Sequence, residues 1–156
     1  MASTRRALAG LATIVTAAAG LSVAAAGPAG AAESGSWRAY GNTNPITSSA
    51  STWRCAGSKT VSTSVVAQVC AVRSPGGGSV QGAVIVRNNR SSLYSMTAAM
   101  DLYTSSGTAL GVWACASSGV GANSWSVCFG RTLAQAGPVN SVGRANDTSL
   151  GMSPSV

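Results

Sequence analysis

The stretches WRCAGS at residues 53–58 and VCAVR at residues 69–73 decide which fold the chain can adopt, because both occur twice. The second copies are WACASS at 113–118 and VCFGR at 127–131. Together the copies contain all four cysteines, at steps of 15 and 13 residues. The two spacings differ by two residues. Side chains alternate between the two faces of a strand, so this even difference leaves the second cysteine of each copy on the same face. The pattern predicts one local unit, two strands joined by a disulfide, used twice as an internal duplication.

The cysteines are expected to pair as Cys55–Cys70 and Cys115–Cys128, which is one of three possible connectivities. Each bridge would close a hairpin-sized loop and stabilise the fold by about 3 kcal/mol. Zinc is the alternative use of four cysteines, but structural zinc sites need cysteine pairs about two to four residues apart. The chain has no such pair and no histidine. We therefore predict no metal site and no cofactor.

Residues 1–32 have the pattern of an export signal. Arg5 and Arg6 form a basic start, and no further charged residue occurs before Glu33. The small residues at 29–31 are a cleavage pattern, with 30–32 as the alternative. A membrane anchor is the rival interpretation, but the segment is rich in Ala, Gly and Thr and ends near Pro28. We predict a secreted, extracellular protein without membrane contact after signal removal, and its even number of cysteines favours disulfides.

The mature chain is expected to have an extended N-terminal arm at 33–52 and a disulfide-stabilised β domain at 53–156. The net charge is +7 with Arg5 and Arg6 and +5 without them. The remaining cations are scattered, whereas nucleic-acid binding requires a basic stripe with aromatic residues. We predict no nucleic-acid partner, although a basic surface can adhere to anionic wall polymers.

Segment 33–52 is polar, and only Trp37, Tyr40 and Ile46 could anchor it to anything. One interpretation is a short strand at a sheet edge followed by a surface loop. The other is an arm that adds a strand to a partner protein. Trp125, like Trp37, lies outside the duplicated pattern and could be an exposed anchor. We predict these four residues as partner-binding residues, and we expect Trp53 and Trp113 to pack on the disulfides.

Short alternating stretches separated by Gly, Ser and Asn recur at intervals of roughly ten residues, which is typical of an all-β fold. The expected architecture is an antiparallel β-sandwich or a small barrel. The clearest buried strand is 79–88, and 92–104 alternates again. Residues 139–142 could form an edge strand, and the tail from residue 146 is expected to be loosely held.

The titratable residues argue against catalysis. Without histidine there is no Ser-His-Asp or Cys-His arrangement, and paired cysteines leave no free thiolate. Asp101 and Asp147 could act as a glycosidase pair only if they faced each other across a cleft. Asp101 is expected on a solvated strand face and Asp147 in a loop, so we predict that the protein is not an enzyme.

The pattern W-x-C-A, QVC at 68–70, QGAVIVRNN at 81–89 and SWSVC at 124–128 resembles small secreted proteins of Streptomyces. One such group is the adaptor subunit of extracellular umbrella toxin particles. The resemblance implies a non-catalytic β protein that joins a lectin-like subunit to a large toxin subunit. We therefore expect an adaptor or structural subunit of an extracellular assembly that binds other secreted proteins.

Two alternative functions remain open. A wall- or carbohydrate-binding module would expose tryptophans side by side on one face. A secreted protease inhibitor would present a rigid loop held by a disulfide, at 56–60 or 117–123.

Overall fold

The computed structural model describes residues 31–156, so nearly all of the predicted export signal lies outside the described residues. Twelve β-strands and no helix occur in this part of the chain, which confirms the all-β class. The strands are β1 Glu33–Ser34, β2 Ser36–Gly41, β3 Thr52–Cys55, β4 Lys59–Ser62, β5 Val65–Arg73, β6 Ser79–Asn88, β7 Tyr94–Thr104, β8 Ala109–Val120, β9 Ser124–Phe129, β10 Leu133–Ala134, β11 Val139–Ala145 and β12 Thr148–Met152.

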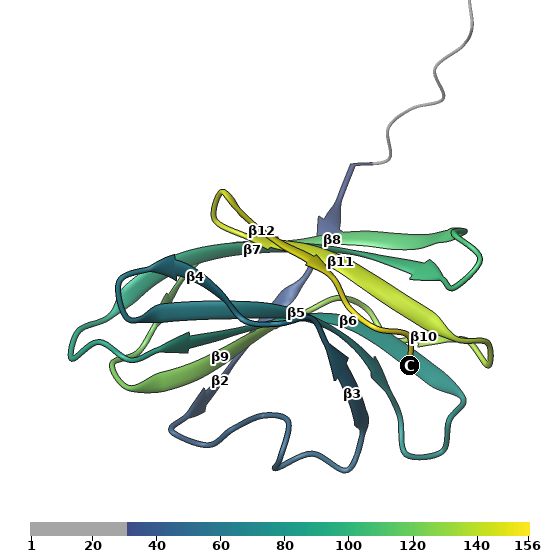
Figure 1. The fold of residues 1–156 in the computed structure, drawn as a ribbon, viewed down its shortest axis with the longest axis horizontal. Helices are drawn as coiled ribbons and strands as arrows, with labels where there is room; N and C mark the ends of the chain where they lie inside the picture. Colours follow the sequence, from purple (N-terminus) through teal and green to yellow (C-terminus); the bar gives the residue numbers. More distant parts are fainter. Residues whose placement is uncertain (1–30) are drawn as a thin grey trace, which may run out of the picture.

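The strands form two sheets that stack as a sandwich (Figure 1). The five-stranded sheet has the order β1-β8-β7-β11-β12. The seven-stranded sheet has the order β2-β9-β6-β5-β3, with β10 added on β6 and β4 on β5. All pairings are antiparallel except β1 with β8. Of the two predicted architectures, the chain adopts the sandwich.

The main core lies between the sheets and follows from the alternation of β5, β6 and β7. Val69 of β5 and Val84 of β6 face Met100 of β7, and all three are fully or almost fully buried. Burying one such side chain contributes roughly 1.5–3 kcal/mol. Trp113 of β8 is also buried here, as predicted, with 1% of its surface exposed.

A second apolar cluster lies on the outer face of the seven-stranded sheet. Its buried members include Val72, Ile85 and Val127. The segment 42–51 connects β2 to β3, which stand at opposite ends of the strand order, and it crosses this face (Figure 1). Ile46 in this covering segment packs on the cluster. The seven-stranded sheet is therefore covered on both faces.

Of the two interpretations of segment 33–52, the structure has the strand at a sheet edge, because this segment pairs with its own domain. β2 runs antiparallel to β9, from Ser36 opposite Phe129 to Gly41 opposite Trp125. Pairing with β9 satisfies backbone groups that an arm would have offered to a partner. An edge strand followed by a surface loop therefore describes the segment, and the arm that adds a strand to a partner does not.

Both predicted disulfides are present, but they are not equivalent. Cys55 and Cys70 lie directly opposite each other on β3 and β5 within one sheet. Cys115 of β8 and Cys128 of β9 instead join the two sheets. The prediction of one structural unit used twice is therefore wrong. The sequence could not show this, because an alternation of period two is the same in a hairpin and in an arch between sheets.

The C-terminal part is also held more firmly than its sequence predicts. β11 lies between β7 and β12 and is not an edge strand. The tail is fixed because Val156 exchanges backbone hydrogen bonds with Val139 in both directions. Arg73 adds four side-chain hydrogen bonds by donating to the carbonyl oxygens of Gly77, Gln135, Gly137 and Val156, at 2.6–3.0 Å.

We expect Arg73→Gln to destabilise the protein by about 2 kcal/mol, because it leaves part-buried carbonyl groups without their donor. Urea unfolding of the purified mature chain measures this change. Arg54→Gln is the matched control, since Arg54 is exposed on β3 and should change stability by less than about 0.5 kcal/mol. Equal midpoints for the two variants would mean that the four hydrogen bonds contribute nothing net.

Candidate functional site

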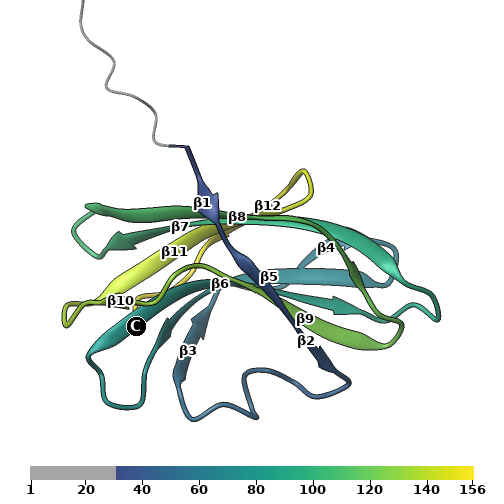
Figure 2. The ribbon, with the colours of Figure 1, turned by 180° about the vertical axis from the view of Figure 1, so that it is seen from behind.

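The outer face of the five-stranded sheet, here called the open face, is not crossed by any segment of residues 31–156 comparable to the covering segment (Figures 1 and 2). Strand register places Val112, Asp101 and Val142 in one row across β8, β7 and β11. Ala114 and Ala99 stand beside them in the next row. These short side chains leave the centre of the face lower than its margins.

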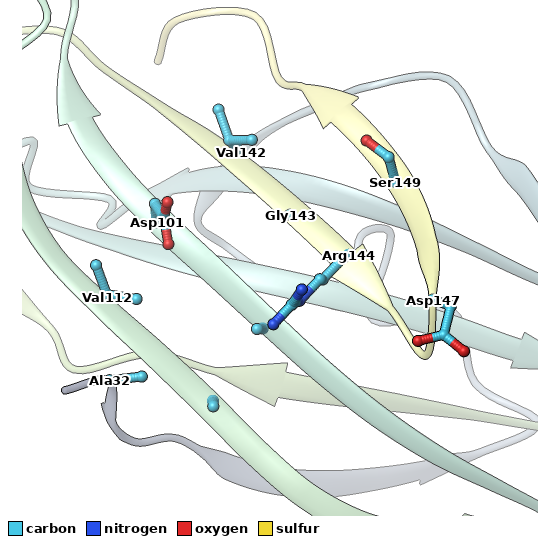
Figure 3. A pocket seen from close by; sticks show the side chains of 10 residues that line it. Ala32, Asp101, Val112, Val142, Gly143, Arg144, Asp147 and Ser149 are labelled. Carbon is cyan, nitrogen blue, oxygen red and sulfur yellow. The ribbon is translucent and has the colours of Figure 1, made fainter. Parts of the chain in front are cut away.

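The result is a hollow of about 490 Å³ over the centre of the open face (Figure 3). A second hollow of about 480 Å³ shares Ala114 and Arg144 with the first and extends to Glu33 and Thr97. A third, of about 440 Å³, lies at the opposite end beside Tyr103 and Met152. The depression therefore runs along most of the open face.

All three carboxylates of the chain border these hollows. Glu33 forms an ion pair with Arg131 at 3.2 Å. Asp101 and Asp147 lie on either side of Arg144 (Figure 3). Within residues 31–156, Asp147 and Arg144 form neither an ion pair nor a side-chain hydrogen bond. The open face thus carries charged groups that the domain itself leaves without partners.

Asp101 is held by its neighbour Tyr103. The Tyr103 hydroxyl donates to Asp101 Oδ2 at 3.1 Å. This hydrogen bond, followed by the negative charge of Asp101 and slight burial, raises the pKa of Tyr103. The phenol consequently remains a hydrogen-bond donor throughout the neutral range.

Sequence reasoning did not expect Asp101 and Asp147 to border the same hollow. Asp101 lies on β7, as predicted, and Asp147 lies in the turn between β11 and β12, as predicted. Pairing of β7 with β11 is what brings them to one face. No group of three or more His, Cys, Asp or Glu residues that could hold a metal occurs in the described part of the chain.

A sequence signal for the open face did exist. The solvent-facing positions of β7 and β8 include Ala99, Val112 and Ala114, where an uncovered strand more often carries longer polar side chains. Contiguous apolar patches on a protein surface are a common feature of contact surfaces.

The four predicted partner-binding residues divide between two places. Tyr40, Ile46 and Trp125 come together in the outer cluster of the seven-stranded sheet, each half-buried. Trp37 faces the other way, packs against the main core and donates from Nε1 to the carbonyl oxygen of Ala116 at 2.8 Å. Trp53, expected in the core, packs edge-to-face on Phe129 in the outer cluster, with ring centroids 5.9 Å apart.

The two stretches expected as loops of a protease inhibitor are loops only in part. Residues 59 and 60 belong to β4, and residues 117–120 belong to β8. Pairing fixes both stretches, because β4 pairs with β5 and β8 pairs with β7. Residues 56–58, next to the bridged Cys55, and residues 121–123 remain outside the strands, so the inhibitor interpretation stays a prediction.

The fold and this site define a disulfide-stabilised β-sandwich with one covered and one open sheet face. Neither a family model nor a curated protein matches the chain. No helix among the described residues is long and apolar enough to cross a membrane.

Proposed function

We propose that the mature chain is a secreted, non-catalytic binding protein that serves as an adaptor or structural subunit of an extracellular protein assembly. The observation that carries this proposal is the contrast between the two outer faces. The chain covers one with its own segment 42–51 and leaves the other open, hollowed and floored with Ala and Val. Layered β folds cover apolar sheet faces, so the open face is the expected contact surface for a partner.

Secretion is supported by the N-terminal pattern and by the two disulfides, which are typical of oxidising compartments. A role as adaptor is supported by the arrangement of the sandwich, since its two outer faces point in opposite directions and can contact two different molecules (Figure 1). The resemblance to umbrella toxin adaptors suggests lectin-like and toxin subunits as the partners.

We expect Ala99→Glu to reduce binding of the protein partner by at least tenfold, because the longer side chain fills the floor of the hollow. Glu at position 99 would stand opposite Arg144 and could pair with it, so the fold should be retained. Cross-linking in culture supernatant, followed by mass spectrometry, measures the amount of partner recovered.

Ser95→Glu is the matched control, because Ser95 is exposed on the same strand and does not line any of the three hollows. It adds the same charge and should leave recovery unchanged. If both variants recover as much partner as the natural sequence, the open face is not the interface.

A further inference from the structure

We propose that a second site, on the seven-stranded sheet, binds the oxyanion groups of an anionic extracellular polymer, such as a polyol phosphate or a uronate chain. Its centre is Arg87 of β6, which lies directly opposite Trp125 of β9. The guanidinium carbon of Arg87 stands 5.3 Å from the Trp125 ring centroid. The site does not involve the open face and does not depend on the function proposed for it.

The Arg87 guanidinium is fixed in orientation by neutral acceptors. Nε donates to Asn89 Oδ1 at 2.7 Å. Nη1 donates to Asn42 Oδ1 at 3.0 Å and to the carbonyl oxygen of Asn123 at 2.8 Å. The acceptors come from the covering segment, the loop after β6 and the turn between β8 and β9. Three separate segments thus hold one cation in place over an aromatic ring.

This cation has no counter-ion in the structure. The only ion pair within residues 31–156 joins Arg131 to Glu33, and the carboxylates border the hollows of the opposite sheet. Nη2 of Arg87 makes no hydrogen bond in the same part of the chain. A guanidinium with a fixed plane and a free N–H edge is well suited to an oxyanion, for which charge-assisted hydrogen bonds are the strongest available.

A second stacked cation lies on the same face. Arg38 of β2 stands 5.1 Å from the Tyr40 ring centroid, and it pairs across the sheet with Val127, two residues from Trp125. β2 and β6 flank β9, so the backbones that carry the two arginines are two strand spacings apart, about 10 Å. Two cations at this spacing, with half-exposed aromatic rings beside them, favour an extended ligand that carries repeated anions over a single small ion.

The chemistry also explains why the ligand should be a polymer of sugars or polyols. The half-exposed rings of Trp125 and Tyr40 are each stacked with an arginine, so their remaining apolar edges can contact C–H groups while the arginines contact the anions. Single-stranded nucleic acid would also offer anions, but it gains most of its affinity by stacking bases on exposed rings. Here arginine side chains already lie over both rings.

The test uses the purified mature chain and titration calorimetry at two salt concentrations. The probes are poly(glycerol phosphate), polygalacturonate, neutral dextran and single-stranded DNA. We expect Arg87→Gln to weaken binding of poly(glycerol phosphate) at least tenfold and Arg38→Gln about threefold. Arg54→Gln, which removes an exposed cation outside the site, should change binding by less than twofold. Binding of the phosphate polymer alone would identify phosphate as the recognised group, and binding of both polymers would identify oxyanions in general.

Urea unfolding distinguishes loss of the site from loss of the fold. Arg87 joins three loops, so its replacement is expected to lower stability. The Arg38 side chain forms no hydrogen bond within the described residues, so its variant should have the stability of the natural sequence. Equal weakening by Arg38→Gln and Arg54→Gln would overturn the proposal, because it would show diffuse attraction of polyanions to a basic surface. Tight binding of dextran or a preference for DNA would overturn it as well.

Discussion

Replacing Cys115 and Cys128 together by alanine should destabilise the protein by about 4–5 kcal/mol, against about 3 kcal/mol for the same double change at Cys55 and Cys70. Loop closure alone predicts nearly equal costs of about 3 kcal/mol, because the two bridges span 13 and 15 residues. The difference arises from position: Cys115 and Cys128 are 3% and 0% exposed, whereas in the other pair Cys70 is fully buried but Cys55 is only half-buried.

Removing the inter-sheet bridge also leaves a small cavity between the layers, and unfilled core volume adds to the lost cross-link. Denaturant unfolding of both double variants measures the two losses of stability. Both the midpoint and the dependence of the unfolding free energy on denaturant concentration are compared. Equal destabilisation would show that loop entropy alone decides the contribution of each bridge. A larger loss at Cys55 and Cys70 would show that the edge strand β3 depends on its cross-link more than the two layers depend on theirs.

The sequence was sufficient for the parts of the fold that local alternation determines. Alternation identified 79–88 as a buried strand, whose Val80, Val84 and Val86 lie in the main core, and short loop length selected the correct cysteine pairs. Alternation says nothing about which sheet a strand joins. For this reason the sequence could not predict that β8 and β9 belong to different sheets, or that β11 lies between β7 and β12.

The same limit applies to the candidate sites. Asp101 and Arg144 belong to β7 and β11, whose pairing joins residues about 40 positions apart, and no local pattern encodes that register. Trp125 and Tyr40 were expected as partner-binding residues, and that role stays a prediction. Their gathering beside Arg87 requires β9 to lie between β2 and β6, which is again a property of the whole sheet.

Gly35 is the residue on which the crossing between the layers depends. It stands between β1 in the five-stranded sheet and β2 in the seven-stranded sheet (Figure 2). Its amide donates to the carbonyl oxygen of Ala114 at 2.8 Å. A Cβ atom at this position would lie 2.8 Å from Cys115 Sγ and 2.9 Å from the carbonyl oxygen of Phe129. The chain can therefore pass over the inter-sheet disulfide only with hydrogen at this position.

We expect Gly35→Val to destabilise the protein by about 3 kcal/mol or more, since neither a buried sulfur nor a paired backbone carbonyl can move aside cheaply. Gly57→Val is the matched control, because a Cβ there meets nothing within 4 Å and the change should cost less than about 0.5 kcal/mol. Thermal and urea unfolding of the two variants measure the difference. Similar stabilities would contradict a tight crossing at Gly35.

A double-mutant cycle identifies what Gly35 must avoid. In the variant with alanine at positions 115 and 128, Gly35→Val should destabilise the protein less than it does in the natural sequence, because the closest side-chain contact is gone. Part of the cost should persist, since the carbonyl oxygen of Phe129 remains where β9 places it. Strict additivity of the two changes would mean that the strand crossing and the disulfide stabilise the junction of the sheets independently. A reduced cost would show that the bridge imposes glycine at residue 35.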